Sequence, residues 1–175
     1  MKDRACTPGQ VSVIPCWELS VCTWRYKLVV MSYEPADTEL KQLADRWIAQ
    51  WNEPSPDERR RLIREVWTED GYQIMVNPPQ GIRETADRYG IPAPAVEIRG
   101  YDAMYARVTR AYEMFIAGGE YVFEQQGEVI RHAGAAVALN WVMRARADGS
   151  AAGSGLEVLT FGPDGRVRTD HQFVA

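Results

Sequence analysis

The chain has 175 residues, enough for one domain with a full hydrophobic core and too few for two such domains. Hydrophobic residues make up 46% of it and charged residues 25%, and the net charge of -4 disfavours nucleic acid as a partner. No apolar run approaches the roughly 20 residues that span a bilayer, and charged residues interrupt the N-terminal stretch where a signal peptide would lie. We therefore expect a cytoplasmic protein that binds neither nucleic acid nor a membrane.

The first thirty residues differ from the rest of the chain. They contain Cys6, Cys16 and Cys22, whose spacing fits neither a metal-binding hook nor a disulfide framework, and they lack a helical period. We expect residues 1–30 to be an extension, either disordered or a mis-assigned start, and residues 31–175 to form the domain. The alternative is an additional N-terminal strand, which the β-branched residues of the segment favour: Val11, Val13, Val21, Val29 and Val30.

Two amphipathic helices are predicted before the first strand. Apolar residues recur at helical spacing over residues 38–52, behind Asp37 and Thr38, which are good N-caps. The sequence "SPDE" from Ser55 to Glu58 is a capping box with proline at the first helical position, so a second helix begins there. The stretch "YQIMV" then predicts a short strand.

Residues 81–99 are rich in charge, proline and small residues, and we expect a loop with one helical turn near Glu84–Tyr89. A third helix is predicted after Gly100, because an apolar stripe follows it and the pair Gly118 and Gly119 would end it.

Every later segment has the pattern of a strand: "YVFEQQG", "EVIRHAGAAVALNWVMRARA", "GSGLEVLTF" and "RVRTDHQFVA". The sequence therefore predicts an α+β fold in which three helices precede a C-terminal antiparallel meander.

This order of elements resembles the NTF2-like superfamily and, within it, the SnoaL-like and ketosteroid-isomerase-like branches. The resemblance rests on "DRWIAQW" in the first helix, "IRGYDAMYARV" at the start of the third and "GLEVLTFGPDGRV" before the final strand, and it covers residues 38–175. It implies a curved antiparallel sheet wrapped against three helices to form a cone with a cavity, usually within a homodimer.

The resemblance also suggests site residues. In ketosteroid isomerases an acid that hydrogen-bonds the substrate oxygen precedes a "V-x-x-F" stretch, and Glu157 has that place here. Trp47 replaces the tyrosine of the first helix, and residues 75–77, where the general base of that family falls, contain no carboxylate. In SnoaL-like cyclases the last strand carries "H-x-D" facing the cavity, and the matching positions are Asp170 and Gln172.

In the last strand, side-chain polarity and the resemblance disagree. Side chains alternate along a strand, so one face carries Arg168, Asp170 and Gln172 and the other carries Val167, Thr169, His171 and Phe173. A hydrophobic-in rule would turn Val167 and Phe173 inward, whereas the resemblance places Asp170 at the cavity. We expect the polar face to line the cavity; the alternative is that Asp170 simply pairs with Arg168 or Arg166.

The long strand pattern before it has two unlike faces. One carries small and polar residues suited to a cavity wall: His132, Gly134, Ala136, Ala138, Asn140 and Val142. The other is bulky and apolar, which suits a subunit contact or the core, and we expect it to form a homodimer contact: Ala135, Val137, Leu139, Trp141 and Met143. A bulge near "HAGAA" would place His132 on the opposite face from Asn140, so the assignment of His132 to this face is weaker than that of Asn140.

No serine-protease triad or phosphate-binding glycine motif appears, and two histidines are too few for a metal cluster, so we expect neither cofactor nor metal. The candidate ligand-binding residues combine two amides with large apolar side chains that also suit the core: Asn140, Gln172, Trp47, Tyr72, Met75, Tyr105 and Phe161.

We interpret the chain as a SnoaL-like protein that holds a small hydrophobic organic molecule and acts as a cofactor-free isomerase, cyclase or hydratase. Asp170 is the candidate general acid or base, with Glu157 or His132 assisting proton transfer. The alternative is a non-catalytic ligand-binding or dimerisation module, in which these polar groups satisfy one another.

Overall fold

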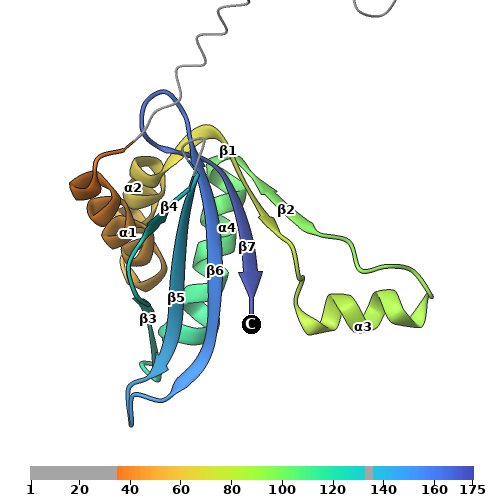
Figure 1. Ribbon diagram of the computed structural model, residues 1–175. Coiled ribbons are helices and arrows are strands. Elements are labelled where there is room, and N and C mark those ends of the chain that lie inside the picture. The colour runs from red at the N-terminus through yellow and green to blue at the C-terminus, as the bar shows by residue number, and fades with distance from the viewer. Residues whose placement is uncertain (1–34, 133–135) are drawn as a thin grey trace, which may run out of the picture. The chain divides into compact units, whose positions relative to one another are not determined.

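The computed structural model describes residues 35–132 and 136–175 (Figure 1). The expectations about residues 1–30 lie outside this described part. Within it the chain forms one sheet of seven strands and four α-helices, and the predicted α+β class is confirmed. Helices α1, α2 and α4 lie on one face of the curved sheet (Figure 1).

The first two predicted helices are confirmed. Helix α1 (Asp37–Asn52) begins where the backbone N–H of Ala36 donates to Oε2 of Glu39 at 2.7 Å. Helix α2 (Pro56–Val66) begins at the predicted capping box, where the N–H of Glu58 donates to Oγ of Ser55 at 3.4 Å. Both helices turn their apolar stripe toward the sheet, which fixes the direction in which α1 presents its two tryptophans.

The third predicted helix is also confirmed. Helix α4 (Gly100–Ala111) continues into one turn of π-helix, η1 (Tyr112–Ile116). The chain leaves this turn at Gly119, whose positive φ of 77° suits glycine. Met104, Val108 and Ala111 form the buried stripe of α4.

The expectation of a loop over residues 81–99 is wrong. This region contains helix α3 (Gln80–Arg88) and strand β2 (Val96–Arg99), which pairs antiparallel with β1 (Trp67–Met75). Helix α3 buries only Ala86, so its sequence lacks the apolar stripe that reveals a helix packed on a core. It lies at the far end of β1 and β2, away from the other helices (Figure 1).

The sheet has the order β2, β1, β7, β6, β5, β3, and a short strand β4 also pairs with β5. Strands β3 (Tyr121–Gln125), β5 (Val137–Ala145), β6 (Ala151–Phe161) and β7 (Val167–Val174) pair antiparallel with one another in this order, as the meander predicts. Strand β7 also pairs with β1 in parallel, so the last strand of the sequence lies inside the sheet.

The predicted long strand over residues 128–147 is not continuous. Strand β4 (Ile130–Arg131) pairs antiparallel with β5, with Ile130 opposite Ala138. The alternation that linked His132 to Asn140 across this segment therefore does not hold. His132 lies at the exposed end of β4.

The two faces of β5 are the reverse of those predicted. Val137, Leu139 and Trp141 belong to the buried core and face the helices, on what we call the inner face of the sheet. Asn140 is opposite Leu156 of β6 and points to the outer face. The prediction that Trp141 and its neighbours form a subunit contact is therefore wrong, since the helices of the same chain already cover them.

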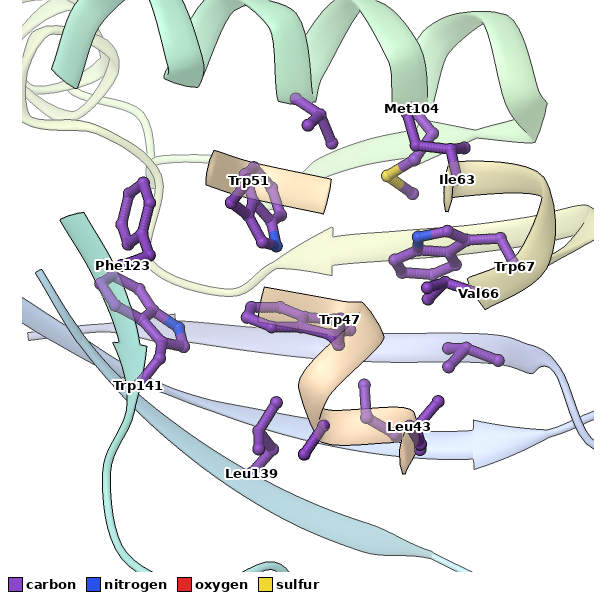
Figure 2. Close-up of a cluster of buried hydrophobic side chains, with 14 of the residues drawn as sticks. Leu43, Trp47, Trp51, Ile63, Val66, Trp67, Met104, Phe123, Leu139 and Trp141 are labelled. Carbon is purple, nitrogen blue, oxygen red and sulfur yellow. The ribbon is translucent and has the colours of Figure 1, made fainter. Parts of the chain in front are cut away.

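Aromatic rings dominate one end of the core (Figure 2). Trp47 and Trp51 of α1 lie with ring centroids 5.5 Å apart, and Trp51 lies 6.2 Å from Phe123 of β3. Phe123 in turn meets Trp141 edge to face at 5.4 Å. Such tilted contacts add to the stabilisation that burial of the rings already provides.

Trp141 has its position because its partner on β6 has no side chain. Gly155 is the register partner of Trp141, and a Cβ atom at Gly155 would lie 2.5 Å from Cζ2 of the indole and 2.7 Å from the carbonyl oxygen of Phe173. The indole therefore lies directly over the glycine backbone.

We predict that Gly155→Ala destabilises the protein by about 1–3 kcal/mol, because the added methyl group must displace the indole or the backbone of β7. Gly153→Ala is the matched control on the same strand, since its nearest neighbour would be Cε of Met143 at 3.7 Å, an ordinary contact. Urea denaturation of both variants checks this. An equal decrease in the free energy of unfolding of the two variants would contradict the close packing of Trp141 on Gly155.

Candidate functional site

A cavity of about 630 Å³ opens between the inner face of the sheet and the helices. Its walls include eight aromatic and thioether side chains, which come from α1, η1, β1, β3 and β5. The beginning of α3 and the prolines before it, Pro78 and Pro79, complete one side. A largely apolar cavity of this size suits an organic molecule of modest size.

Two carboxyl groups are buried directly behind this wall. Glu157 of β6 and Asp170 of β7 are both 0% exposed, and their carboxyl groups lie close enough to shift each other's pKa. Oε2 of Glu157 and Oδ1 of Asp170 are buried without a hydrogen-bond partner, so a proton shared between the two acids would satisfy both oxygens. One proton must be shared in this arrangement, because two buried carboxylates would repel each other.

Neutral donors satisfy the remaining oxygens. Nε1 of Trp141 donates to Oε1 of Glu157 at 2.6 Å, and Nε2 of Gln172 donates to the same oxygen at 2.9 Å. Nε2 of Gln73 donates to Oδ2 of Asp170 at 2.8 Å.

Burial raises the pKa of both acids, but to different degrees. Burial raises the pKa of Glu157 well above its ordinary value, and the charge of Asp170 raises it further. Burial also raises the pKa of Asp170, to about 6, while hydrogen bonds from Glu157 and Gln73 and the charge of Arg107 act to lower it. The raised pKa values indicate that the pair keeps one proton, and the charge of Arg107, which acts to lower the pKa of Asp170, favours that proton on Glu157.

Gln172 and Arg107 connect the acid pair to the cavity. Gln172 lines the cavity while its amide binds Glu157, and Arg107 of α4 lines it while one of its terminal nitrogens lies 3.4 Å from Oε1 of Gln172. The guanidinium also lies over the ring of Trp51, 5.2 Å from its centroid. Neither Glu157 nor Asp170 is itself part of the cavity wall.

The polar face of β7 lies inward, as the family resemblance suggested. Asp170 and Gln172 are buried on the inner face, and Phe173 is 40% exposed on the outer face. The pairing of β6 with β7 shifts between Thr160 and Phe161, and this irregularity turns Val167 into the core as well.

The same irregularity removes Arg168 from the site. Arg168 was expected to share the face of Asp170, but its side chain is exposed and lies 3.4 Å from Asp70. The cation that affects Asp170 is Arg107, from a different element.

Three of the candidate ligand-binding residues line the cavity: Trp47, Met75 and Gln172. The others do not. Tyr72 lies on the outer face under the guanidinium of Arg99, and Tyr105 lies under that of Arg60. Phe161 packs against the core. Asn140 lies on the outer face of the sheet, so the sheet separates it from the cavity, and His132 is exposed after β4.

The sequence reasoning missed Gln73, Arg107 and the inward position of Trp141. One signal was available for Arg107: it falls within the buried stripe of α4, between Met104 and Ala111, where a solvated arginine has no place. A signal for Gln73 was weaker, since alternation puts it on the face of Met75 but does not identify Asp170 as its partner.

Among the described residues, no group of three or more histidine, cysteine or acidic side chains is arranged to hold a metal ion. In that same part of the chain, none of the helices combines the length and the apolar character needed to cross a membrane.

The sequence matches no protein-family model, and it matches none of the curated proteins. Solved structures do match. A SnoaL-like family protein from Agrobacterium tumefaciens, provisionally named an isomerase, superimposes with a TM-score of 0.61 at 20% identity over 79% of this chain and 98% of that one. A SnoaL-like protein of unknown function from Burkholderia thailandensis gives a TM-score of 0.55 at 21% identity, over 81% and 98% of the two chains.

A third structure, provisionally named a SnoaL-like polyketide cyclase, comes from Jannaschia sp. CCS1. It gives a TM-score of 0.54 at 16% identity, over 81% of this chain and 89% of that one. The likeness is one of fold, and it confirms the resemblance drawn from the sequence: the chain has the NTF2-like fold of SnoaL-like proteins.

Proposed function

We propose that the chain binds a small, largely apolar organic molecule in the cavity and transfers a proton on it without a cofactor, as an isomerase, cyclase or hydratase. The observation that carries the proposal is the pair of buried, neighbouring carboxyl groups directly behind an apolar wall, each with one oxygen that has no partner. A buried acid with a pKa near that of its working pH suits general acid and base catalysis. The provisional names of the structural neighbours, isomerase and polyketide cyclase, agree with this class of reaction.

The two acids divide the roles. Asp170 is the proton acceptor because it is ionised at neutral pH, and Glu157 is the donor because it keeps its proton. Gln172 stands between the pair and the cavity, and on the cavity side it is held only by the 3.4 Å contact with Arg107. Rotation of the Gln172 side chain would open Oε1 of Glu157 to a bound molecule. Glu157 would then accept a proton from the ligand at Oε1 while its Oε2 proton passes to Asp170, and the reverse transfer would return the proton to the ligand.

A non-catalytic binding module is the second candidate, and a specific observation favours it. Every partner of the acid pair is a side chain of the protein, and neither acid lines the cavity. In that case the pair would fix β6 to β7 and would take no part in chemistry.

Proton transfer can be measured without knowledge of the natural reaction. We predict that the wild type accelerates α-hydrogen exchange of bicyclic aromatic ketones such as 2-tetralone in D₂O, followed by proton NMR. Asp170→Asn should reduce this rate by about 100-fold or more, since it removes the base, and should change ketone affinity by less than about threefold.

Asp45→Asn is the matched control, because Asp45 pairs with Lys41 on the exposed side of α1. It should leave exchange unchanged. Ketone binding with no acceleration by the wild type would favour the non-catalytic module, and an active Asp170→Asn variant would contradict the role of Asp170.

The proposed proton on Glu157 predicts a pH dependence of stability. An acid whose pKa is raised by folding makes the folded state less stable as the pH rises above its unfolded pKa, near 4.5. Glu157→Gln copies the protonated form, so its free energy of unfolding relative to the wild type should increase by up to about 1.4 kcal/mol per pH unit above pH 5. Urea denaturation at pH 5, 6 and 7 measures this difference.

Glu113→Gln serves as the control because Glu113 is exposed on η1. Its difference from the wild type should be the same at all three pH values. A constant difference for Glu157→Gln would show that Glu157 is ionised in the folded protein and would contradict the shared proton.

We also propose a homodimer, formed through the outer face of the sheet rather than through the residues first expected. Four apolar side chains and one histidine from three adjacent strands meet there, half-buried except for the exposed Phe173: Ile74, Leu156, Val158, His171 and Phe173. We predict a dimeric mass by light scattering and a monomeric mass for Val158→Glu, with Thr38→Glu on the exposed side of α1 unchanged. A monomeric wild type would contradict this proposal.

A further inference from the structure

The charged side chains of the cavity wall are all cations. Arg83 of α3 and Arg107 and Arg110 of α4 line the cavity, and no aspartate or glutamate side chain of the described residues does. Arg83 and Arg110 take part in none of the ion pairs of the described residues. The backbone of Ala175 also reaches the wall, and it forms no ion pair with these arginines.

Arg107 is the most deeply placed of the three, and the protein does not satisfy its guanidinium. Its Nε is buried with no hydrogen-bond partner, and its contact with Gln172 is, at 3.4 Å, longer than an ordinary hydrogen bond. Burial lowers the pKa of Arg107, against the charges of Glu157 and Asp170, which act to raise it. Those two acids share one proton, so they supply about one negative charge to three guanidinium groups.

Two further donors in the same wall lack partners. Nε1 of Trp47 and Nε1 of Trp51 are buried without a hydrogen bond, and both indoles line the cavity. The ring of Trp51 also lies under the guanidinium of Arg107, whose Cζ is 5.2 Å from the ring centroid. Unpaired buried donors are costly, so a group rich in acceptors is the natural complement of this wall.

We propose that the molecule bound in this cavity is a carboxylic acid with a flat apolar body, and that Arg107 binds its carboxylate. The inference rests on the proposed function, because it specifies the ligand of the same cavity. The planar guanidinium can bind a carboxylate through two parallel hydrogen bonds, and Arg83 and Arg110 add attraction from the rim. The apolar body lies among Trp47, Trp51, Phe123 and Trp141.

This orientation has a consequence for the acid pair. A carboxylate held by Arg107 competes with the amide oxygen of Gln172 for the same guanidinium. Binding therefore removes the one contact that holds Gln172 on the cavity side, and the carbon atoms next to the carboxylate come to lie beside Gln172 and the acids behind it. The anionic group thus also acts to open the acid pair to the ligand.

The test compares two probes of one shape and different charge, 2-naphthoate and 2-naphthamide, by isothermal titration calorimetry. The wild type should bind 2-naphthoate at least tenfold more tightly than 2-naphthamide. Arg107→Gln should remove this preference and leave the affinity for 2-naphthamide within about threefold, because it removes the cation and keeps a polar side chain. Arg107→Lys should keep part of the preference, since it retains the charge but loses the planar pair of donors.

Arg168→Gln is the control for loss of one positive charge, since Arg168 is exposed and pairs with Asp70 outside the cavity. It should keep the full preference. If Arg107→Gln does not fold, the affinities of the wild type and of Arg107→Lys for the two probes test the inference. Equal affinity of the wild type for both probes, or a preference that survives in Arg107→Gln, would overturn the inference and leave the proposed function intact. Failure of both probes to bind would overturn the inference and the proposed function together.

Discussion

The structure depends on the removal of two carboxyl groups from water at one point of the sheet. Glu157 and Asp170 cannot both be ionised there, so they must share a proton, and each remaining oxygen needs a donor. Trp141, Gln172 and Gln73 supply these donors from three different strands. Three other features support this arrangement. Gly155 leaves room for the indole of Trp141, the shifted pairing of β6 with β7 precedes Asp170 on its strand, and the buried Arg107 acts on the charge of Asp170.

The amphipathic helices and the inward face of β7 could be predicted from the sequence because each has a local signal or a match to a known family. Helices α1, α2 and α4 have both a cap or a stop and an apolar stripe. The polarity of β7 contradicted a hydrophobic-in rule, and only the family resemblance placed Asp170 and Gln172 correctly.

The faces of β5 could not be predicted in the same way. Ala138 and Val142 on its outer face are about as buried as Leu139 and Trp141 on its inner face. Apolar residues therefore occur on both faces of β5, and the alternation of side chains does not show which face is the inner one. The polar partner of Trp141 is an acid on another strand, which periodicity does not reveal. Helix α3 was not predicted because only one of its side chains is buried, so its sequence has no apolar stripe. The outward position of Arg168 follows from the shifted pairing of β6 with β7, which the sequence of β7 alone does not reveal.

The parallel pairing of β1 with β7 has a consequence for folding kinetics. The hydrogen bond from Gln73 to Asp170 joins residues 97 positions apart, so the chain between them must be largely collapsed before the two strands meet. Contacts of such long range form slowly, whereas α1 and α2 can form from local interactions. Until β7 enters the sheet, both acids are in water and ionised at neutral pH. Burial of the two acids when β7 pairs with β1 and β6 therefore takes up a proton from the solvent, and folding is coupled to proton concentration.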